Sequence, residues 1–299
     1  MDIVTLEIFK TVAAELSITR AAAQLGRVQS NVTTRIQSLE GQLGVALFNR
    51  DNKKLRLTDQ GQVFLQYAHR LLALANEAQQ AMHPATPQGT LRLGSMESTA
   101  ASRLPVPLSQ FHQASPGVIL RVTTGPSQRL IDLLDRGEID CALLAMPYEG
   151  DDEPEDILQS YAFAGERAYA EVLRVVLPKG CTPGDLLGQA GRMSLAAFQA
   201  GCSYRQLAGQ WLAAQGSGNA LDVHEVGSYH AMLACVAAGQ SFSVIPQSVL
   251  QLSAELASVE LGDSIPYPTW LVWRAGYSTA AFDAFRAVLR HSYSPNYQS

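Results

Sequence analysis

Basic side chains are concentrated in one early stretch of the chain, between Ser17 and Leu57. This stretch holds seven of them against the two acidic residues Glu40 and Asp51, which leaves a formal charge of +5. The basic residues are Arg20, Arg27, Arg35, Arg50, Lys53, Lys54 and Arg56. A local excess of positive charge binds the phosphates of nucleic acid. The stretch is therefore predicted to contact nucleic acid, although the whole chain carries −5.

The second part of the chain has the opposite charge and carries hydroxyl groups at four predicted helix starts. From Ala85 onward there are 13 Lys and Arg against 20 Asp and Glu. The hydroxyls belong to Ser98 and Thr99, to Ser127, to Ser203 and to Ser228. Free N–H groups and the helix dipole make helix starts good anion sites. A small-molecule site is one reading of this pattern, and ordinary N-capping, which needs no ligand, is the other.

Two charged residues beside these helix starts indicate what such a site would hold. Arg205 follows Ser203 by two residues, and its planar guanidinium pairs well with a carboxylate. A surface role for Arg205 is an equal alternative. Glu97 lies beside Ser98 and would hold an amine. The pair favours a ligand that carries an amine, a carboxylate or both, such as an amino acid.

The residues of catalysis and metal binding lack the spacing that these functions need. The four cysteines form no C-x-x-C pair, the six histidines show no ligand spacing, and no G-x-S-x-G or P-loop pattern is present. A Schiff-base enzyme needs a lysine, and Lys179, the only one after Ala85, lies in an apparent turn. We expect no enzyme, no metal and no cofactor. The acidic start and the lack of a long apolar run predict a cytoplasmic protein without a membrane partner.

The elements that must position the basic residues are three helices, a hairpin and a longer helix. Apolar residues recur at helical spacing from Leu6, Ser17 is a good N-cap for a helix over 18–25, and Gly26 supplies a turn before a third helix over 30–43. The stretches 47–50 and 55–57 flank a polar, turn-prone segment and predict a hairpin with a basic tip. The pattern is a winged helix-turn-helix.

A long helix and a linker follow the hairpin. Thr58 is expected to cap a helix that runs to about Met82 and bears an apolar stripe. This stripe consists of Phe64, Tyr67, Leu71, Leu74, Ala75, Ala78 and Met82. A single helix cannot bury such a stripe, so a dimerisation arm is the favoured reading, and packing on its own domain is the alternative. The segment 83–89, with two prolines, ends the helix.

Alternating strands and helices predict an α/β fold for the rest of the chain. Strands are predicted over 91–95, 118–124 and 139–145, with a helix over 126–136. A second set comprises a strand at 173–177, helices at 203–215 and 229–238, and a strand at 241–245. The last strand, 269–274, and the helix after it are expected to return to the first set.

Several early segments resemble the LysR family of bacterial transcriptional regulators. They are Leu6-Glu7-Ile8-Phe9, Ser17-Ile18-Thr19-Arg20-Ala21-Ala22, Gln29-Ser30-Asn31-Val32-Thr33-Thr34-Arg35-Ile36, Leu39-Glu40, Leu43-Gly44, Leu47-Phe48-Asn49-Arg50 and Leu57-Thr58. The resemblance continues through Gly94-Ser95 and Thr124-Gly125-Pro126-Ser127 to the final strand and helix. It implies a regulator that binds double-stranded DNA and a small-molecule effector.

The resemblance also assigns the residues that would contact DNA. In the family the third helix enters the major groove and the wing reaches the phosphate backbone. The corresponding residues on the helix are Gln29, Ser30, Asn31, Thr33, Thr34 and Arg35, and those on the wing are Arg50, Lys53 and Lys54. Helix packing remains an alternative for Thr33, and a solvated turn remains one for Lys53 and Lys54.

For the second part, the resemblance implies a two-lobed domain like type 2 periplasmic binding proteins. The residues expected to bind the effector are Ser98, Thr99, Thr124, Gly125, Ser127, Ser203, Tyr204, Arg205 and Ser228. The segments 201–205 and 228–235 resemble a branch of the family associated with putrescine utilisation. Cys202 lies where some members carry a peroxide-sensing cysteine, but without an apparent resolving partner a packed thiol is favoured.

These inferences give a predicted domain plan. Residues 1–58 form the DNA-binding domain, 59–88 the linker helix and hinge, and 89–299 the effector domain. Its first lobe covers about 89–160 and 266–299, and its second about 161–265. The linker helix is expected to form a homodimer and, by resemblance, a homotetramer. A periplasmic binding protein would explain the effector domain but not the basic helix-turn-helix.

Overall fold

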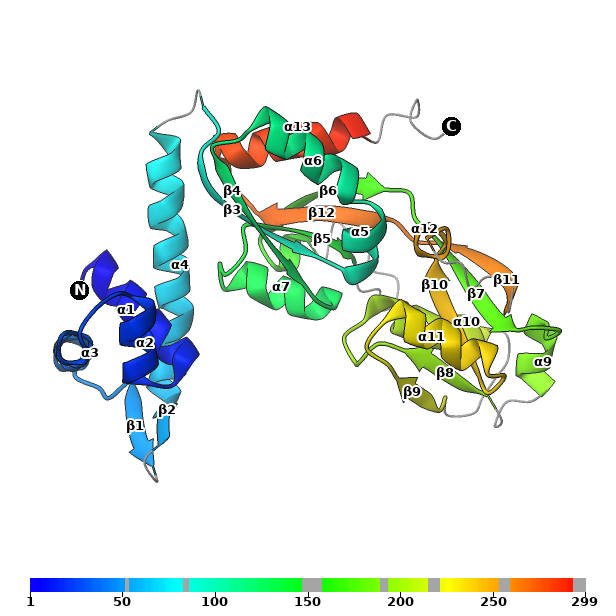
Figure 1. The fold of residues 1–299 in the computed structure, drawn as a ribbon, viewed down its shortest axis with the longest axis horizontal. Coiled ribbons are helices and arrows are strands. Elements are labelled where there is room, and N and C mark those ends of the chain that lie inside the picture. The colour runs from blue at the N-terminus through cyan, green and yellow to red at the C-terminus, as the bar shows by residue number, and fades with distance from the viewer. Residues whose placement is uncertain are drawn as a thin grey trace. The chain divides into compact units, whose positions relative to one another are not determined.

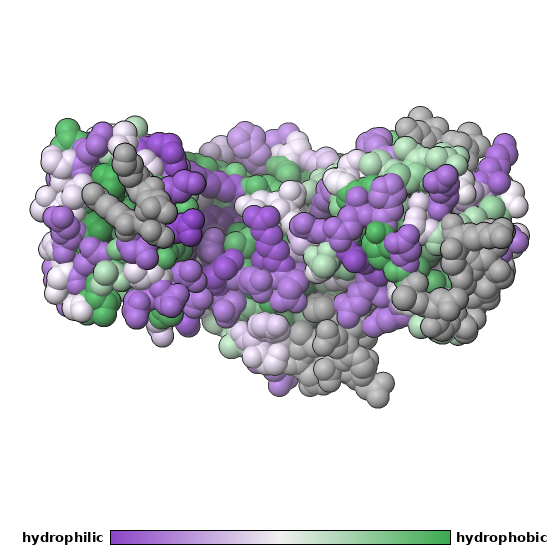
Figure 2. Space-filling view, turned by 90° about the horizontal axis from the view of Figure 1, so that it is seen from below, coloured by the Kyte–Doolittle hydropathy of each residue, from purple (hydrophilic) through white to green (hydrophobic). Residues whose placement is uncertain are grey.

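The computed structural model describes residues 1–51, 54–82, 86–146, 158–188, 193–214, 221–252 and 259–292. It divides into two compact units. Unit 1 is Met1–Ala85 with Asp135–Glu138, and unit 2 is Thr86–Leu134 with Ile139–Ser299. On the face drawn in Figure 2, hydrophilic residues predominate and hydrophobic ones appear in small groups between them. Among the described helices, none is both long enough and apolar enough to cross a membrane.

Unit 1 has the three predicted helices, the hairpin and the long helix (Figure 1). The order is α1 (Ile3–Glu15), α2 (Ile18–Gln24), α3 (Gln29–Leu43), β1 (Phe48–Asp51), β2 (Lys54–Leu57) and α4 (Asp59–Ala81). The predicted N-caps are confirmed, because Ser17 Oγ accepts a hydrogen bond from the Arg20 amide and Thr58 Oγ1 accepts one from the Gly61 amide. Gly26 adopts a positive φ of 60° at the turn between α2 and α3.

The core of unit 1 is centred on Phe9 of α1. Its side chain is fully buried, with its ring centroid 5.5 Å from that of Phe48 and 5.1 Å from that of Phe64. Buried residues of all three short helices surround it, among them Leu6, Ala21 and Ile36. Since Phe48 belongs to β1 and Phe64 to α4, this one ring joins the first helix to the hairpin and to the long helix.

In unit 2 the first sheet has the strand order β4-β3-β5-β12-β6. Its strands are β3 (Gly89–Ser95), β4 (Val118–Thr124), β5 (Cys141–Ala145), β6 (Phe163–Tyr169) and β12 (Thr269–Arg274). The strands β3, β4 and β5 are parallel, whereas β12 is antiparallel to both of its neighbours. The accompanying helices are α5 (Glu97–Ser102), α6 (Pro105–Ala114), α7 (Ser127–Asp135) and α13 (Ala280–Ser292). We call this assembly the first lobe.

The second sheet has the strand order β11-β7-β10-β8-β9. Its strands are β7 (Val172–Pro178), β8 (Ser194–Ala197), β9 (Val223–Glu225), β10 (Ser241–Pro246) and β11 (Val259–Pro266). The helices around it are α9 (Pro183–Gly188), α10 (Ser203–Ala214), α11 (Tyr229–Ala237) and α12 (Gln247–Leu250). This assembly is the second lobe, and Figure 1 shows the two sheets side by side within unit 2.

The lobe boundary differs from the predicted one in one strand. The sequence places 161–265 in the second lobe, but β6 pairs with β12 in the first sheet, where Ala164 lies opposite Trp273. Pairing with a strand so far along the chain leaves no local sign in the sequence, which explains the error. The chain therefore crosses to the second lobe near Glu171, between β6 and β7, and returns near Tyr267, whose amide donates to the Glu171 carbonyl at 2.9 Å.

Candidate functional site

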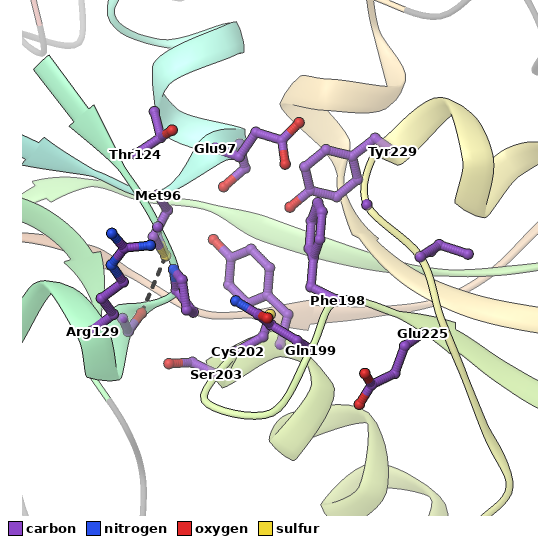
Figure 3. Close-up of a pocket in the computed structure, with 17 residues that line it drawn as sticks. Met96, Glu97, Thr124, Arg129, Phe198, Gln199, Cys202, Ser203, Glu225 and Tyr229 are labelled. Carbon is purple, nitrogen blue, oxygen red and sulfur yellow. Dashed lines mark hydrogen bonds between the residues drawn. The ribbon is translucent and has the colours of Figure 1, made fainter. Parts of the chain in front are cut away.

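A cavity of about 460 Å³ lies between the two lobes of unit 2 (Figure 3). The first lobe contributes the segments that follow β3 and β4, and the second lobe contributes the segments that follow β8 and β9. The lining residues are Met96, Glu97, Ser98, Thr124, Gly125, Pro126, Ser127, Arg129, Phe198, Gln199, Cys202, Ser203, Tyr204, Glu225, Val226, Gly227 and Tyr229. Its volume falls in the range of small-molecule sites, about 300–1,000 Å³.

The structure brings most of the predicted effector residues together in this cavity. Six of the nine line it, namely Ser98, Thr124, Gly125, Ser127, Ser203 and Tyr204. The other three do not. Thr99 is buried and is not part of the lining, and Ser228 caps α11 by accepting a hydrogen bond from the Ala231 amide at 3.2 Å. Arg205 points to Glu225, with Nη1 2.6 Å from Oε1, so this guanidinium already has a carboxylate partner.

The lining hydroxyls differ in whether the protein already uses them. Ser203 Oγ donates to the Ala145 carbonyl at 3.1 Å, and Ser127 Oγ donates to the Met96 sulfur at 3.4 Å. In contrast, Ser98 Oγ and Tyr204 Oη are buried, and within the described part of the chain neither has a hydrogen-bond partner of adequate geometry, although the Ser98 hydroxyl lies near enough to Tyr204 to lower its pKa against the larger effect of burial. A buried polar group without a partner is costly. These two oxygens are therefore the lining groups best placed to bond to a ligand.

Aromatic rings form the second-lobe wall of the cavity. Phe198 and Tyr229 meet edge to face, with ring centroids 5.0 Å apart and planes at 90°. Tyr204 is also in this wall and packs against Tyr267 at a centroid distance of 6.1 Å. Burial raises the pKa values of Tyr204 and Tyr229 well above the ordinary phenol range, and the nearby Ser98 hydroxyl opposes the shift. Both phenols are therefore neutral donors at physiological pH.

Two charged side chains of the first lobe also face the cavity. Glu97 begins α5, and Arg129 lies in the first turn of α7 (Figure 3). Desolvation raises the pKa of Glu97, and the charge of His230 acts against this shift. Arg129 was not among the predicted site residues, although its position two residues after Ser127 repeats the spacing of Arg205 from Ser203. Phe198 was not predicted either, because it follows β8 and that strand was not predicted from the sequence.

The Cys202 thiol lies at the edge of the same cavity. Burial raises its pKa, so the thiol stays protonated and is a poor nucleophile. This agrees with the packed thiol favoured from the sequence. Within the described residues, no group of three or more His, Cys, Asp and Glu side chains is arranged to hold a metal ion.

The predicted DNA-contacting residues lie at the exposed start of α3. Gln29, Ser30, Asn31 and Thr34 are exposed, and Thr33 is half-buried. Arg35 is bonded within the unit, since its Nη1 is 3.0 Å from the Asp2 carboxylate and 3.3 Å from the Thr5 hydroxyl.

Two of the predicted wing residues, Arg50 and Lys54, lie on the strands of the hairpin. Lys54 begins β2 and is exposed, and Arg50 lies in β1 opposite Leu55. Lys53 lies outside the described residues.

The apolar stripe of α4 divides between two roles. Phe64 packs into the core of unit 1, whereas Tyr67, Leu71 and Leu74 are exposed. Val63, also exposed, joins Tyr67 in lining an apolar surface groove of about 400 Å³ at the start of α4. The exposed residues lie in a helical stripe and form an apolar surface suited to a second chain.

Two family descriptions match the chain. Residues 3–62 match the bacterial regulatory helix-turn-helix protein, lysR family, and residues 84–294 match the LysR substrate binding domain. Among curated relatives, the uncharacterized HTH-type transcriptional regulator YusT of Bacillus subtilis is 36% identical over 86% of this chain and 82% of its own. The HTH-type transcriptional regulator GltR of the same organism is 33% identical over 84% of this chain and 81% of its own.

Solved structures of two regulators share the fold. The match to a full-length OxyR variant from Pseudomonas aeruginosa covers 97% of this chain and 95% of the OxyR chain, with a TM-score of 0.70 and 21% sequence identity. Full-length CbnR in complex with its target DNA matches 98% of this chain and 100% of its own, with a TM-score of 0.66 and 21% identity.

Proposed function

Because this chain belongs to the LysR family and is a DNA-binding transcriptional regulator with a C-terminal effector-binding domain, we propose that the cavity of unit 2 binds the effector. The effector carries an amine, a carboxylate or both. The observation that carries the proposal is the buried, unpartnered hydroxyl of Ser98 beside that of Tyr204, in a cavity lined by both lobes. A ligand that bonds to both lobes favours one arrangement of them over others.

The proposal is tested by the thermal stability of the full chain in the presence of amines, carboxylates and amino acids. A compound at 100 times its dissociation constant adds about 2.7 kcal/mol to the free energy of unfolding. A Cβ at Gly227, which lines the cavity, would have no heavy atom within 4 Å, so Gly227→Phe adds a large ring to the lining without a backbone clash. We expect this variant to fold and to lose the stabilisation by the compound.

The matched control is Gly209→Phe, at a position of α10 that is equally open but outside the lining. It is expected to keep the stabilisation. If no compound stabilises the wild-type chain, or if the Gly227 variant is stabilised as much as the wild type, the cavity is not the effector site.

The proposed DNA interface consists of the exposed start of α3 and the hairpin. Gln29, Ser30, Asn31, Thr33, Thr34 and Arg35 face the major groove, and Arg50, Lys53 and Lys54 reach the phosphates. Short polar side chains at the start of a recognition helix suit the donors and acceptors of base edges. For Arg35 to reach DNA, the guanidinium must leave Asp2, so the helix start carries base recognition more directly than Arg35 does.

Lys54→Ala is expected to weaken binding to all DNA sequences about equally, because a phosphate contact carries no base information. Losing one such contact reduces the magnitude of the negative slope of log affinity against log salt concentration by about 0.9. Fluorescence anisotropy over a salt series measures this slope. Lys179→Ala, an exposed lysine of unit 2, is the control and should leave the slope unchanged. An unaltered slope in the Lys54 variant would contradict the wing contact.

The proposed partner for the exposed stripe of α4 is the same helix of a second chain, which gives a homodimer. Pairs of dimers would form the homotetramer and bind a partly symmetric DNA site. The two DNA-binding heads are then spaced by the effector domains, and the effector changes this spacing.

Leu74→Asp tests the dimer, because Leu74 is 61% exposed and belongs to the stripe. Burying a leucine contributes about 1.5–3 kcal/mol, and a symmetric interface contains it twice. The dimer dissociation constant should therefore rise at least about tenfold in sedimentation equilibrium. Gln79→Asp, an exposed polar position of α4, adds the same charge and should have little effect. Equal dissociation constants for the two variants would rule out this face.

A further inference from the structure

Glu97 is a carboxylate that the protein itself leaves without a bonded partner. Within the described part of the chain it makes no hydrogen bond or ion pair, its exposed side chain lines the cavity, and the charge of His230 favours its ionised form only in part. Desolvation raises its pKa, which means that the ionised form is less favourable here than in water. A cation bound in the cavity would relieve this cost.

Aromatic rings lie next to this carboxylate. In Figure 3 the Glu97 carboxylate points toward the side of the cavity where Tyr229 and Phe198 lie. Burial is the main cause that raises the pKa of Tyr229, and the charge of Glu97 adds to this effect. Aromatic faces attract cations, and a carboxylate beside them adds a charged acceptor. This side of the cavity therefore suits an ammonium group.

Arg129 supplies the opposite charge at the other side of the drawn cavity (Figure 3). Its stem lies over Gly125, where an added Cβ would be 3.4 Å from Arg129 Cδ. Within the described residues, the structure gives Arg129 no acidic partner, whereas Arg205 already bonds to Glu225 at 2.6 Å. Arg129 is thus the arginine available to a ligand carboxylate, in the role that the sequence assigned to Arg205.

We propose that the effector is a zwitterionic amino-carboxylate, whose ammonium group lies between Glu97 and the rings of Tyr229 and Phe198 and whose carboxylate pairs with Arg129. This inference rests on the proposed function, since it assigns the ligand class of the same cavity. Both charged contacts belong to the first lobe and the aromatic contacts to the second. The ammonium group therefore joins the two lobes, which a carboxylate on Arg129 alone does not.

The test uses isothermal titration calorimetry of the full-length protein with compounds that separate the two charges. The zwitterions are the proteinogenic L-amino acids, 4-aminobutyrate, 5-aminopentanoate and L-norvaline, and the singly charged counterparts are pentylamine and pentanoate. At least one zwitterion should bind the wild type more tightly than either counterpart. Glu97→Gln and Arg129→Gln should each lower the affinity for that zwitterion ten- to hundredfold, since each substitution removes one charge-assisted contact.

The counterparts show which charge each residue recognises. Glu97→Gln should weaken the binding of pentylamine but not that of pentanoate. Arg129→Gln should weaken the binding of pentanoate but not that of pentylamine. Arg121→Gln and Asp222→Asn, which alter exposed charges outside the lining, are the controls and should leave all affinities unchanged. Glu97→Gln should melt at the wild-type temperature or above without ligand, because the amide removes the desolvated charge. This excludes misfolding as the cause of lost binding.

Several results would overturn the proposal. One is that no zwitterion of the set binds more tightly than the singly charged compounds. Another is that both variants bind the zwitterion like the wild type. A third is that Arg205→Gln, rather than Arg129→Gln, loses carboxylate binding. In each case, if Gly227→Phe still abolishes binding of whichever compound does bind, the cavity remains the effector site and only the ligand class or its assignment is wrong.

Discussion

Phe9→Ala is expected to lower the free energy of unfolding of unit 1 by about 3–5 kcal/mol, as do large-to-small changes of buried aromatic residues. The Phe9 ring is fully buried and contacts the rings of Phe48 and Phe64 at centroid distances of 5.5 and 5.1 Å. Its loss leaves a cavity where α1, the hairpin and α4 meet. A loss of this size is comparable to the whole stability of a small domain. DNA binding should therefore be lost with the fold of unit 1.

Circular dichroism melts and DNA binding of the full chain test this expectation together. Ile3→Ala serves as the control, because Ile3 lies on the same helix and is 45% exposed. A surface change of this kind alters stability by no more than about 0.5 kcal/mol. The packing account of unit 1 would be wrong if the Phe9 variant melted and bound DNA as the Ile3 variant does.

Glu171→Ala is expected to destabilise unit 2 by about 3 kcal/mol, because it removes the buried partner of the ion pair with the partly exposed Arg103 and the acceptor of two further hydrogen bonds. Glu171 is 5% exposed and lies where the chain crosses between the lobes. Its carboxylate accepts two hydrogen bonds from Arg103 at 3.2 Å, and one from Ser248 Oγ at 2.9 Å. The Val172 amide also donates to it at 3.2 Å. Alanine would leave all these donors without their acceptor.

Urea unfolding of the full chain, followed at a signal of unit 2, measures the effect. The control is Glu225→Ala, which breaks the exposed ion pair with Arg205, where the Glu225 side chain is 55% exposed. Exposed ion pairs contribute about 0–1 kcal/mol, so the two variants should differ by about 2 kcal/mol or more. Equal losses of unfolding free energy in the two variants would show that the hydrogen bonds of Glu171 do not stabilise the place where the chain passes between the lobes.

The Glu171 network also offers a physical connection between the cavity and the crossing. Helix α5 begins with Glu97 and Ser98 in the cavity and ends with Ser102. Ser102 Oγ donates to Ser248 Oγ at 3.0 Å, and Ser248 in turn donates to Glu171. Because α5 is short and Ser248 belongs to the second lobe, a ligand that moves the start of α5 also acts on the junction of the lobes.

The sequence predicted the elements whose signals are local. Side-chain caps at Ser17 and Thr58 mark the starts of α2 and α4, and both were found. The strands Val118–Thr124 and Thr269–Arg274 have the predicted bounds. The family resemblance is confirmed by the matched family descriptions and relatives. Among the predicted effector residues, Ser98, Gly125 and Ser127, which follow β3 and β4, line the cavity because parallel strands end at the same edge of the sheet.

The features that the sequence missed depend on partners far along the chain. The place of β6 in the first sheet follows from its pairing with β12. Arg205 was predicted to bind a ligand, and only the folded chain shows that its guanidinium already pairs with the Glu225 carboxylate. Arg35 was predicted to face DNA, and the structure places Asp2 and Thr5 beside it. A sequence shows which residues carry charge but not which of those charges the fold has already paired.

The claim that the cavity controls DNA binding is tested most directly by measuring the two binding equilibria together. The wild-type chain is titrated with a duplex from upstream of its own gene, with and without a saturating compound that stabilises it. The compound is expected to change DNA affinity by about 5- to 150-fold, and DNA is expected to change the affinity for the compound by the same factor. Gly227→Phe should bind the DNA and show no such change. An unchanged DNA affinity at saturating compound in the wild type would contradict the account.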